Sequence, residues 1–271
     1  MDATGKYLSQ SYHPIFVVWL RYMGQAVVTI LIFLPRLPRV MRSERVGLQV
    51  LRSGFLLAAT LLFFFGFSLV PLADGAAIAQ VAPFFIMGLA VLVLGETVGW
   101  FRWCAATLGF IGAMVIIQPG AAAFTWGSLL LLGGATMFAA FSISTRVLGR
   151  SDPVSTTFLY TGMVGAVAMS LIVPFYWEVP NAVDIPWIVV IGLFGAAGQG
   201  MLILALKFAA PQVIAPLMYF QLIWAGSIGY AVFGDVPGTN ALIGAAIIVA
   251  AGLIVQWRER YVARSKVSEN G

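Results

Sequence analysis

The sequence predicts an all-α polytopic membrane protein, and three observations carry this prediction. First, 61% of the 271 residues are apolar and only 9% are charged, whereas about a quarter of the residues in a soluble domain are charged. Second, the mean hydropathy is +0.98. Third, the apolar residues form continuous runs of about twenty, the length that an α-helix needs to cross a bilayer, rather than the alternating segments of a membrane barrel. A water-soluble enzyme and a disordered chain are excluded, and the single Cys excludes a disulfide-rich fold.

Nine apolar runs of this kind follow one another along the chain. The stretch from Trp103 to Thr145 holds no charged residue in 43 positions. One helix of that length would measure about 64 Å, so Pro119-Gly120 is expected to divide it into two. The predicted spans are 15–34, 50–70, 76–94, 102–118, 125–145, 154–174, 186–206, 212–233 and 240–257.

The basic residues predict the orientation of these spans. Arg and Lys gather at every second connection, which the positive-inside rule assigns to the cytoplasm, whereas the opposite connections carry acidic residues and no Lys or Arg. We therefore expect an inner-membrane protein whose basic tail, residues 258–271, is cytoplasmic. A nucleic-acid partner is not expected, because the charge is spread over short loops. Thirteen of the 15 basic residues lie on the predicted cytoplasmic side: Arg36, Arg39, Arg42, Arg45, Arg52, Arg102, Arg146, Arg150, Lys207, Arg258, Arg260, Arg264 and Lys266.

The two halves of the chain match at a constant offset of 139 positions. The match predicts two repeats of five helices, residues 1–118 and 125–257. Since five is odd, the repeats are inverted relative to each other, an arrangement typical of secondary transporters. The matching positions are Pro14 with Pro153, Pro35 with Pro174, Ala76 with Ala215, and Gly95-Glu96 with Gly234-Asp235.

The first repeat contains only the tail of its first helix, from Met1 to about Leu8. We therefore expect that Met1 is an internal residue of a longer protein with ten helices and a cytoplasmic N-terminus.

Four stretches resemble the EamA-like ten-helix family of the drug/metabolite transporter superfamily. They are Asp2 to Leu8 followed by Pro14 and Trp19 to Tyr22; Leu72 to Ile78 with Pro83; Leu94-Gly95-Glu96 with Trp100 to Trp103 and Gly109 to Gly112; and Gly234-Asp235 with Gly244 and Gly252. The resemblance spans the whole chain and implies two five-helix units, a central cavity and transport of a small metabolite. The opening stretch is most similar to a bacterial subgroup that includes S-adenosylmethionine and riboflavin importers. The second unit departs from the family pattern, with Asp235 in place of Glu and Leu222 in place of Pro.

Arg21 is the only charged residue expected well inside a span, about 9 Å from its outer end. A charge at that depth is costly and usually faces a cavity or a partner helix. Gln25 lies one turn further on the same face, which favours a polar lining that binds an anionic or carboxylate group. Snorkelling of Arg21 to the outer headgroups is the alternative.

The repeat predicts further lining residues, because a cavity on the pseudo-axis should be lined by equivalent positions of both units. The offset pairs Thr60 with Gln199 and Gln80 with Tyr219. The alternative for the glutamines is interhelical hydrogen bonding, and Tyr219 and Trp224 could be packing residues. The candidate substrate-binding residues are Arg21, Gln25, Thr60, Gln80, Gln199, Tyr219 and Trp224.

These patterns predict a secondary transporter that moves a small organic metabolite by alternating access. The alternatives are an intramembrane enzyme and an accessory structural subunit, but no catalytic, metal-binding or phosphate-binding motif appears, so no enzyme activity, metal or cofactor is expected. The expected partners are the metabolite and the lipid bilayer, and a homodimer is left open.

Overall fold

The computed structural model describes the chain except for residues 96–98, 119–124, 150, 209–219 and 270–271. Within the described part the fold is built from helices alone. The α-helices are α1 (Asp2–Leu8), α2 (Pro14–Phe33), α3 (Leu37–Val40), α4 (Val46–Leu69), α5 (Leu72–Ala79), α6 (Ala82–Leu94), α7 (Trp100–Ile117), α8 (Trp126–Leu148), α9 (Val154–Ile172), α10 (Ile185–Phe208), α12 (Phe220–Phe233) and α13 (Thr239–Glu269). Three short 3-10 segments accompany them, Leu34–Arg36, Val173–Tyr176 and Ala182–Asp184.

Among the described residues, six segments are long and apolar enough to cross a membrane: Pro14–Val40, Val46–Leu69, Leu72–Val93, Trp126–Leu148, Val154–Tyr176 and Ala182–Ala205. Shorter apolar helices, Trp103–Ile117, Gln221–Phe233 and Thr239–Ile254, fall on the three remaining predicted spans. A polytopic membrane protein is therefore confirmed, whereas nine full spans stay a prediction. The described helix α13 continues through Glu269, so much of the predicted tail extends the last span as a helix.

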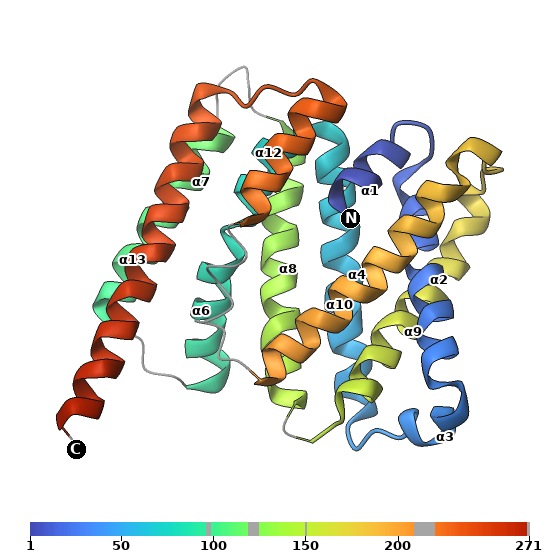
Figure 1. The fold of residues 1–271 in the computed structure, drawn as a ribbon, viewed down its shortest axis with the longest axis horizontal. Helices are drawn as coiled ribbons and strands as arrows, with labels where there is room; N and C mark the ends of the chain where they lie inside the picture. The colour runs from blue at the N-terminus through green and yellow to red at the C-terminus, as the bar shows by residue number, and fades with distance from the viewer. Residues whose placement is uncertain (96–98, 119–124, 150, 209–219, 270–271) are drawn as a thin grey trace.

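The helices form an elongated row in Figure 1. At one end of the row α7 packs against α13, and at the other α2 packs against α9. Between them, α4 packs along α8, and α10 crosses the bundle to pack against α2. Many large apolar side chains on the outside of the bundle are exposed, among them Leu92 (82%) and Met201 (71%), as expected for a surface that faces lipid.

The predicted span 76–94 is divided in the structure. Helix α5 ends at Ala79 and α6 begins at Ala82, with Pro83 in the first turn of α6. Proline lacks the N–H that a continuous helix would need and is tolerated in a first turn. Gln80 therefore lies at the break, between two apolar helices and 2% exposed.

Two helices approach each other without intervening side chains. A Cβ placed on Gly24 of α2 would lie 2.5 Å from the Cα of Gly192 in α10. Because glycine has no side chain, α2 and α10 can come this close, as small residues allow in membrane bundles. The contact holds α10 beside the face of α2 that carries Arg21.

Candidate functional site

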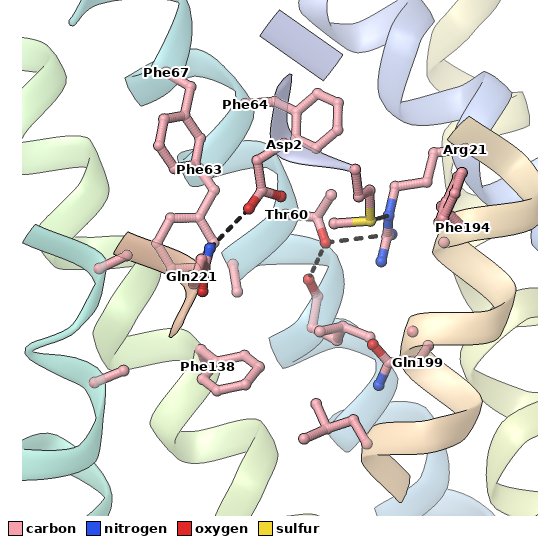
Figure 2. Close-up of a pocket in the computed structure, with 18 of the residues that line it drawn as sticks. Asp2, Arg21, Thr60, Phe63, Phe64, Phe67, Phe138, Phe194, Gln199 and Gln221 are labelled. Atoms are coloured by element: carbon pink, nitrogen blue, oxygen red, sulfur yellow. Dashed lines mark hydrogen bonds between the residues drawn. The ribbon is translucent and has the colours of Figure 1, made fainter. Parts of the chain in front are cut away.

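A cavity of about 330 Å³ lies in the middle of the bundle and is lined from both halves of the chain (Figure 2). Helices α1, α2, α4 and α5 contribute to it from the first half, and α8, α10 and α12 from the second. Its volume is in the range of sites that hold small molecules. The apolar wall is largely aromatic, with Phe63, Phe64, Phe67, Phe138 and Phe194. The polar lining side chains are Asp2, Arg21, Thr60, Gln80, Gln199 and Gln221.

Arg21 projects from α2 into this cavity and is only 2% exposed. Its Nη1 lies 3.5 Å from Oγ1 of Thr60, its Nε lies 3.3 Å from the Met1 sulfur, and its guanidinium lies 4.7 Å from the centre of the Tyr22 ring. Gly195 of α10 leaves room for the stem, because a Cβ there would lie 3.2 Å from Cγ of Arg21. Burial inside the bundle favours a cavity-lining arginine over snorkelling.

The guanidinium of Arg21 has no acidic partner among the described residues. In that part of the chain, the ion pair with a nitrogen–oxygen distance below 4.0 Å is the one between Lys6 and Asp235, and it does not involve Arg21. An unpaired buried cation is costly, so Arg21 is suited to bind an anionic group that enters the cavity.

Thr60 and Gln199, which the repeat pairs, lie in the same cavity from α4 and α10. The Thr60 hydroxyl donates to the Leu56 carbonyl at 2.8 Å, and its oxygen accepts from Arg21 and from the Tyr22 hydroxyl at 3.2 Å. The Nε2 of Gln199 is buried without a hydrogen-bond partner in the described structure. Gln80 also lines the cavity, at the break between α5 and α6.

Two predicted residues lie elsewhere. Gln25 is fully buried, but it is not among the lining residues, because this part of α2 packs against α9, where a Cβ on Gly162 would lie 3.4 Å from Cγ of Gln25. Trp224 of α12 is 67% exposed and does not line the cavity, whereas Gln221 of the same helix does. Gln25 and Trp224 are therefore not among the residues that line this cavity, and a role for them in substrate binding stays a prediction. Tyr219 lies outside the described residues.

Sequence reasoning missed Asp2, Gln221 and the phenylalanines as lining residues. Asp2 begins α1, and its Oδ2 accepts a hydrogen bond of 2.8 Å from Nε2 of Gln221 (Figure 2). Because no span was assigned to residues 2–8, this acidic side chain was not expected to line a cavity. The phenylalanines gave no signal, because 20 of them are spread along the chain.

The structure also corrects the position of Arg52. The sequence analysis placed it with the cytoplasmic loops, but it lies inside α4 and is completely buried. Its Nε donates to Oγ1 of Thr145 at 2.7 Å and its Nη1 to Oγ1 of Thr161 at 2.8 Å. It also lies 4.5 Å from the centre of the Phe141 ring. Arg21 is therefore not the only charge within a span.

Near Arg52, a polar cluster joins the start of α4 to the connection between α8 and α9. Asp152 accepts hydrogen bonds from the Ser43 hydroxyl, from Nε2 of Gln49 at 2.7 Å and from the backbone N–H of Glu44 at 3.2 Å. Burial opposes ionisation of Asp152. The hydrogen bonds outweigh that effect and hold the pKa of this carboxyl below its usual value of 3.8.

An ion pair joins three segments near the other end of α4. Nζ of Lys6 lies 2.6 Å from Oδ2 of Asp235 and donates to the Val70 carbonyl at 3.2 Å. The same Asp235 oxygen accepts from the backbone N–H of Leu72 at 3.1 Å. Burial raises the pKa of Asp235. The hydrogen bonds from Lys6 and from the Leu72 backbone lower it by more than burial raises it, so the pKa of this carboxyl lies below its usual value of 3.8. Helix α1 is thereby tied to the α4–α5 and α12–α13 connections.

A bundle of apolar helices around a central cavity with a buried, unpaired cation defines a class: a multi-pass membrane protein that binds a small solute. The model of the EamA-like transporter family matches residues 2–118 and 125–257. The chain belongs to the EamA-like transporter family. It is a secondary transporter of a small metabolite, and not an enzyme.

Several relatives match nearly the whole chain. The S-adenosylmethionine uptake transporter of Rickettsia prowazekii (strain Madrid E) is 24% identical over 98% of this chain and 90% of its own length. The riboflavin transporter of Vibrio cholerae serotype O1 is 30% identical over 89% of this chain and 84% of its own length. A solved crystal structure shares the fold, with a TM-score of 0.71 over 96% of this chain and 94% of that chain, at 17% sequence identity.

Proposed function

We propose that the chain moves its metabolite by alternating access through the central cavity. The observation that carries this proposal is the cavity itself, which helices of both halves enclose and which holds the unpaired guanidinium of Arg21. A site between two halves can open to either side of the membrane when the halves rock against each other.

The packing of the helices supports an inverted repeat of residues 1–118 and 125–257. Adding the offset of 139 converts α2 into α9, α4 into α10 and α7 into α13. Helix α2 packs against its own counterpart α9, and α7 against its counterpart α13. The contact between α2 and α10 has an equivalent between α9 and α4. Such self-paired and exchanged contacts are expected around a twofold pseudo-axis.

We further propose an inner-membrane location with a cytoplasmic C-terminus, as the distribution of Arg and Lys predicts. A reporter fused after Gly271 should be active in the cytoplasm, and activity only in the periplasm would overturn this orientation. The homodimer also remains a proposal, and light scattering of the detergent-solubilised protein measures its mass.

The experiment that tests transport is uptake into proteoliposomes. The panel comprises S-adenosylmethionine and riboflavin, the substrates named for the relatives, together with the 20 amino acids. We expect saturable uptake of at least one member, which Arg21→Ala abolishes while the protein still inserts and elutes as a single species. Protein-free liposomes are the control. Lack of saturable uptake for every member, with and without a pH gradient, would count against the proposal.

A further inference from the structure

We infer that the cavity selects a zwitterion with an apolar body, whose anionic group binds Arg21 and whose cationic group binds Asp2. This inference rests on the proposed transport function and names its substrate class. It depends on two charged side chains that line one cavity without pairing with each other.

The anionic pole of the substrate is set by Arg21. Arg21 is 2% exposed, and the neighbours of its guanidinium are a hydroxyl, a thioether and an aromatic ring, none of which carries a negative charge. A planar guanidinium offers two parallel N–H donors to a carboxylate. An entering carboxylate would therefore neutralise a charge that the described residues leave unpaired.

The cationic pole is set by Asp2. No positively charged group of the described chain lies within 4.0 Å of its carboxylate. Gln221 donates to Oδ2 at 2.8 Å, which orients the carboxylate without neutralising it. In Figure 2, Asp2 and Arg21 reach the cavity from different sides, with Thr60 between them. A ligand with both charges can therefore contact both residues at once.

The rest of the cavity wall is largely apolar. Phe63, Phe64 and Phe67 of α4 contribute to it together with Phe138 of α8 and Phe194 of α10. Aromatic faces bind apolar and ring-shaped groups, and they also attract a cation that lies over them. The cavity of about 330 Å³ accommodates a small metabolite. A ligand with one charge would leave the opposite pole unpaired, and a neutral ligand would leave both.

Matched ligand sets test this selection by calorimetric binding to the purified protein. One set is L-tryptophan, tryptamine and indole-3-propionate, and the other is L-methionine, 3-(methylthio)propylamine and 4-(methylthio)butanoate. Within each set the body is constant, while the zwitterion loses its carboxylate or its ammonium group. Since a hydrogen bond to a charged group contributes about 1.5–3 kcal/mol, we expect at least one zwitterion to bind about ten- to a hundredfold more tightly than both its analogues.

Two variants assign the poles. Asp2→Asn should lower the affinity of the zwitterion to that of its acid analogue and leave the acid unchanged. Arg21→Gln should lower the affinity of the zwitterion to the affinity of its amine analogue. Glu44→Gln is the matched charge control, because Glu44 is exposed and does not line the cavity, and it should bind all ligands as wild type does. Phe63→Leu should weaken all three members of a set by the same factor.

The inference is overturned if neither zwitterion binds, if the three members of each set bind equally, or if Asp2→Asn leaves the preference intact. These results are separable from the test of transport. Saturable uptake of a panel metabolite without charge selection refutes only the substrate class, whereas charge-selective binding without uptake refutes only transport.

Discussion

The ion pair between Lys6 and Asp235 is predicted to hold the outer end of the cavity closed. Lys6 lies one turn beyond Asp2 on α1, and the pair ties that helix to the α4–α5 and α12–α13 connections. In the predicted orientation these connections face outward. Lys6→Met removes the bond, and the cavity should then open more often to the outside.

The size of the effect follows from the burial of the pair. A hydrogen bond between charged groups contributes about 1.5–3 kcal/mol, but the side chains are 12% and 22% exposed, and solvent reduces the contribution to about 1–2 kcal/mol. Loss of the pair should raise the population of the open form about 5- to 30-fold.

The assay measures modification of a cysteine in the cavity. Ala59→Cys supplies a lining reporter, and Cys104→Ser removes the exposed native cysteine. In intact cells, a membrane-impermeant maleimide should label the reporter about 5- to 30-fold faster in Lys6→Met. Asp235→Asn should act alike, and the double variant should add nothing further. Lys207→Met, at the far end of α10, is the control for loss of one lysine.

A labelling rate within twofold of wild type would refute the reasoning. Multiplicative effects of the two single variants would do the same, because residues that act through one bond cannot contribute independently.

Three further predictions concern stability, measured as thermal unfolding in detergent. Arg52→Ala should lower the free energy of unfolding by about 2–4 kcal/mol, because it leaves a cavity and removes hydrogen bonds. Arg52→Met should lower it by about 2 kcal/mol less than Arg52→Ala, because Met refills the volume without a buried charge. Equal losses of stability in the two variants would contradict this. Asp152→Asn should lower the melting temperature at pH 7. Because folding depresses the pKa of Asp152, the stabilisation from its carboxylate is complete above pH 3.8 and is lost as the pH falls through the lower pKa of the folded state. A difference in melting temperature between Asp152→Asn and wild type that changes between pH 5 and 8 would be inconsistent with this reasoning. Gly24→Val should separate α2 from α10 and destabilise the fold by about 1–3 kcal/mol or more. Gly47→Val is the control, because a Cβ on Gly47 meets nothing within 4 Å, and it should destabilise the fold by less than half as much.

The sequence was most informative where the physics is local. Continuous apolar runs predicted the six long apolar segments of the described chain, because length and hydropathy alone decide whether a helix can cross a bilayer. Arg21 could be singled out for the same reason, since a charge in an apolar run is conspicuous without any knowledge of packing. The repeat led to Thr60, Gln80 and Gln199, which all line the cavity.

The sequence was least informative where neighbouring helices decide. Gln25 shares a helical face with Arg21, yet α9 covers it while α10 leaves Arg21 at the cavity. Arg52 lies close to basic loop residues in sequence, but the hydroxyls that surround it come from α8 and α9. Asp2 gains its position from Gln221, 219 residues away. Pairings of this kind cannot be derived from periodicity.

The break at Gln80 has a consequence for how the chain enters the membrane. Helix α5 has 8 residues and α6 has 13, so they measure about 12 Å and 20 Å, and neither could cross a hydrocarbon core of about 30 Å alone. The insertion machinery must therefore accept Leu72–Val93, with a hydropathy of 2.2, as one continuous segment during synthesis. The interruption at Gln80 and Pro83 has to be tolerated in that segment before any other helix can shield it. A charged residue placed beside Gln80 would thus impair biogenesis, even where the finished cavity could accommodate it.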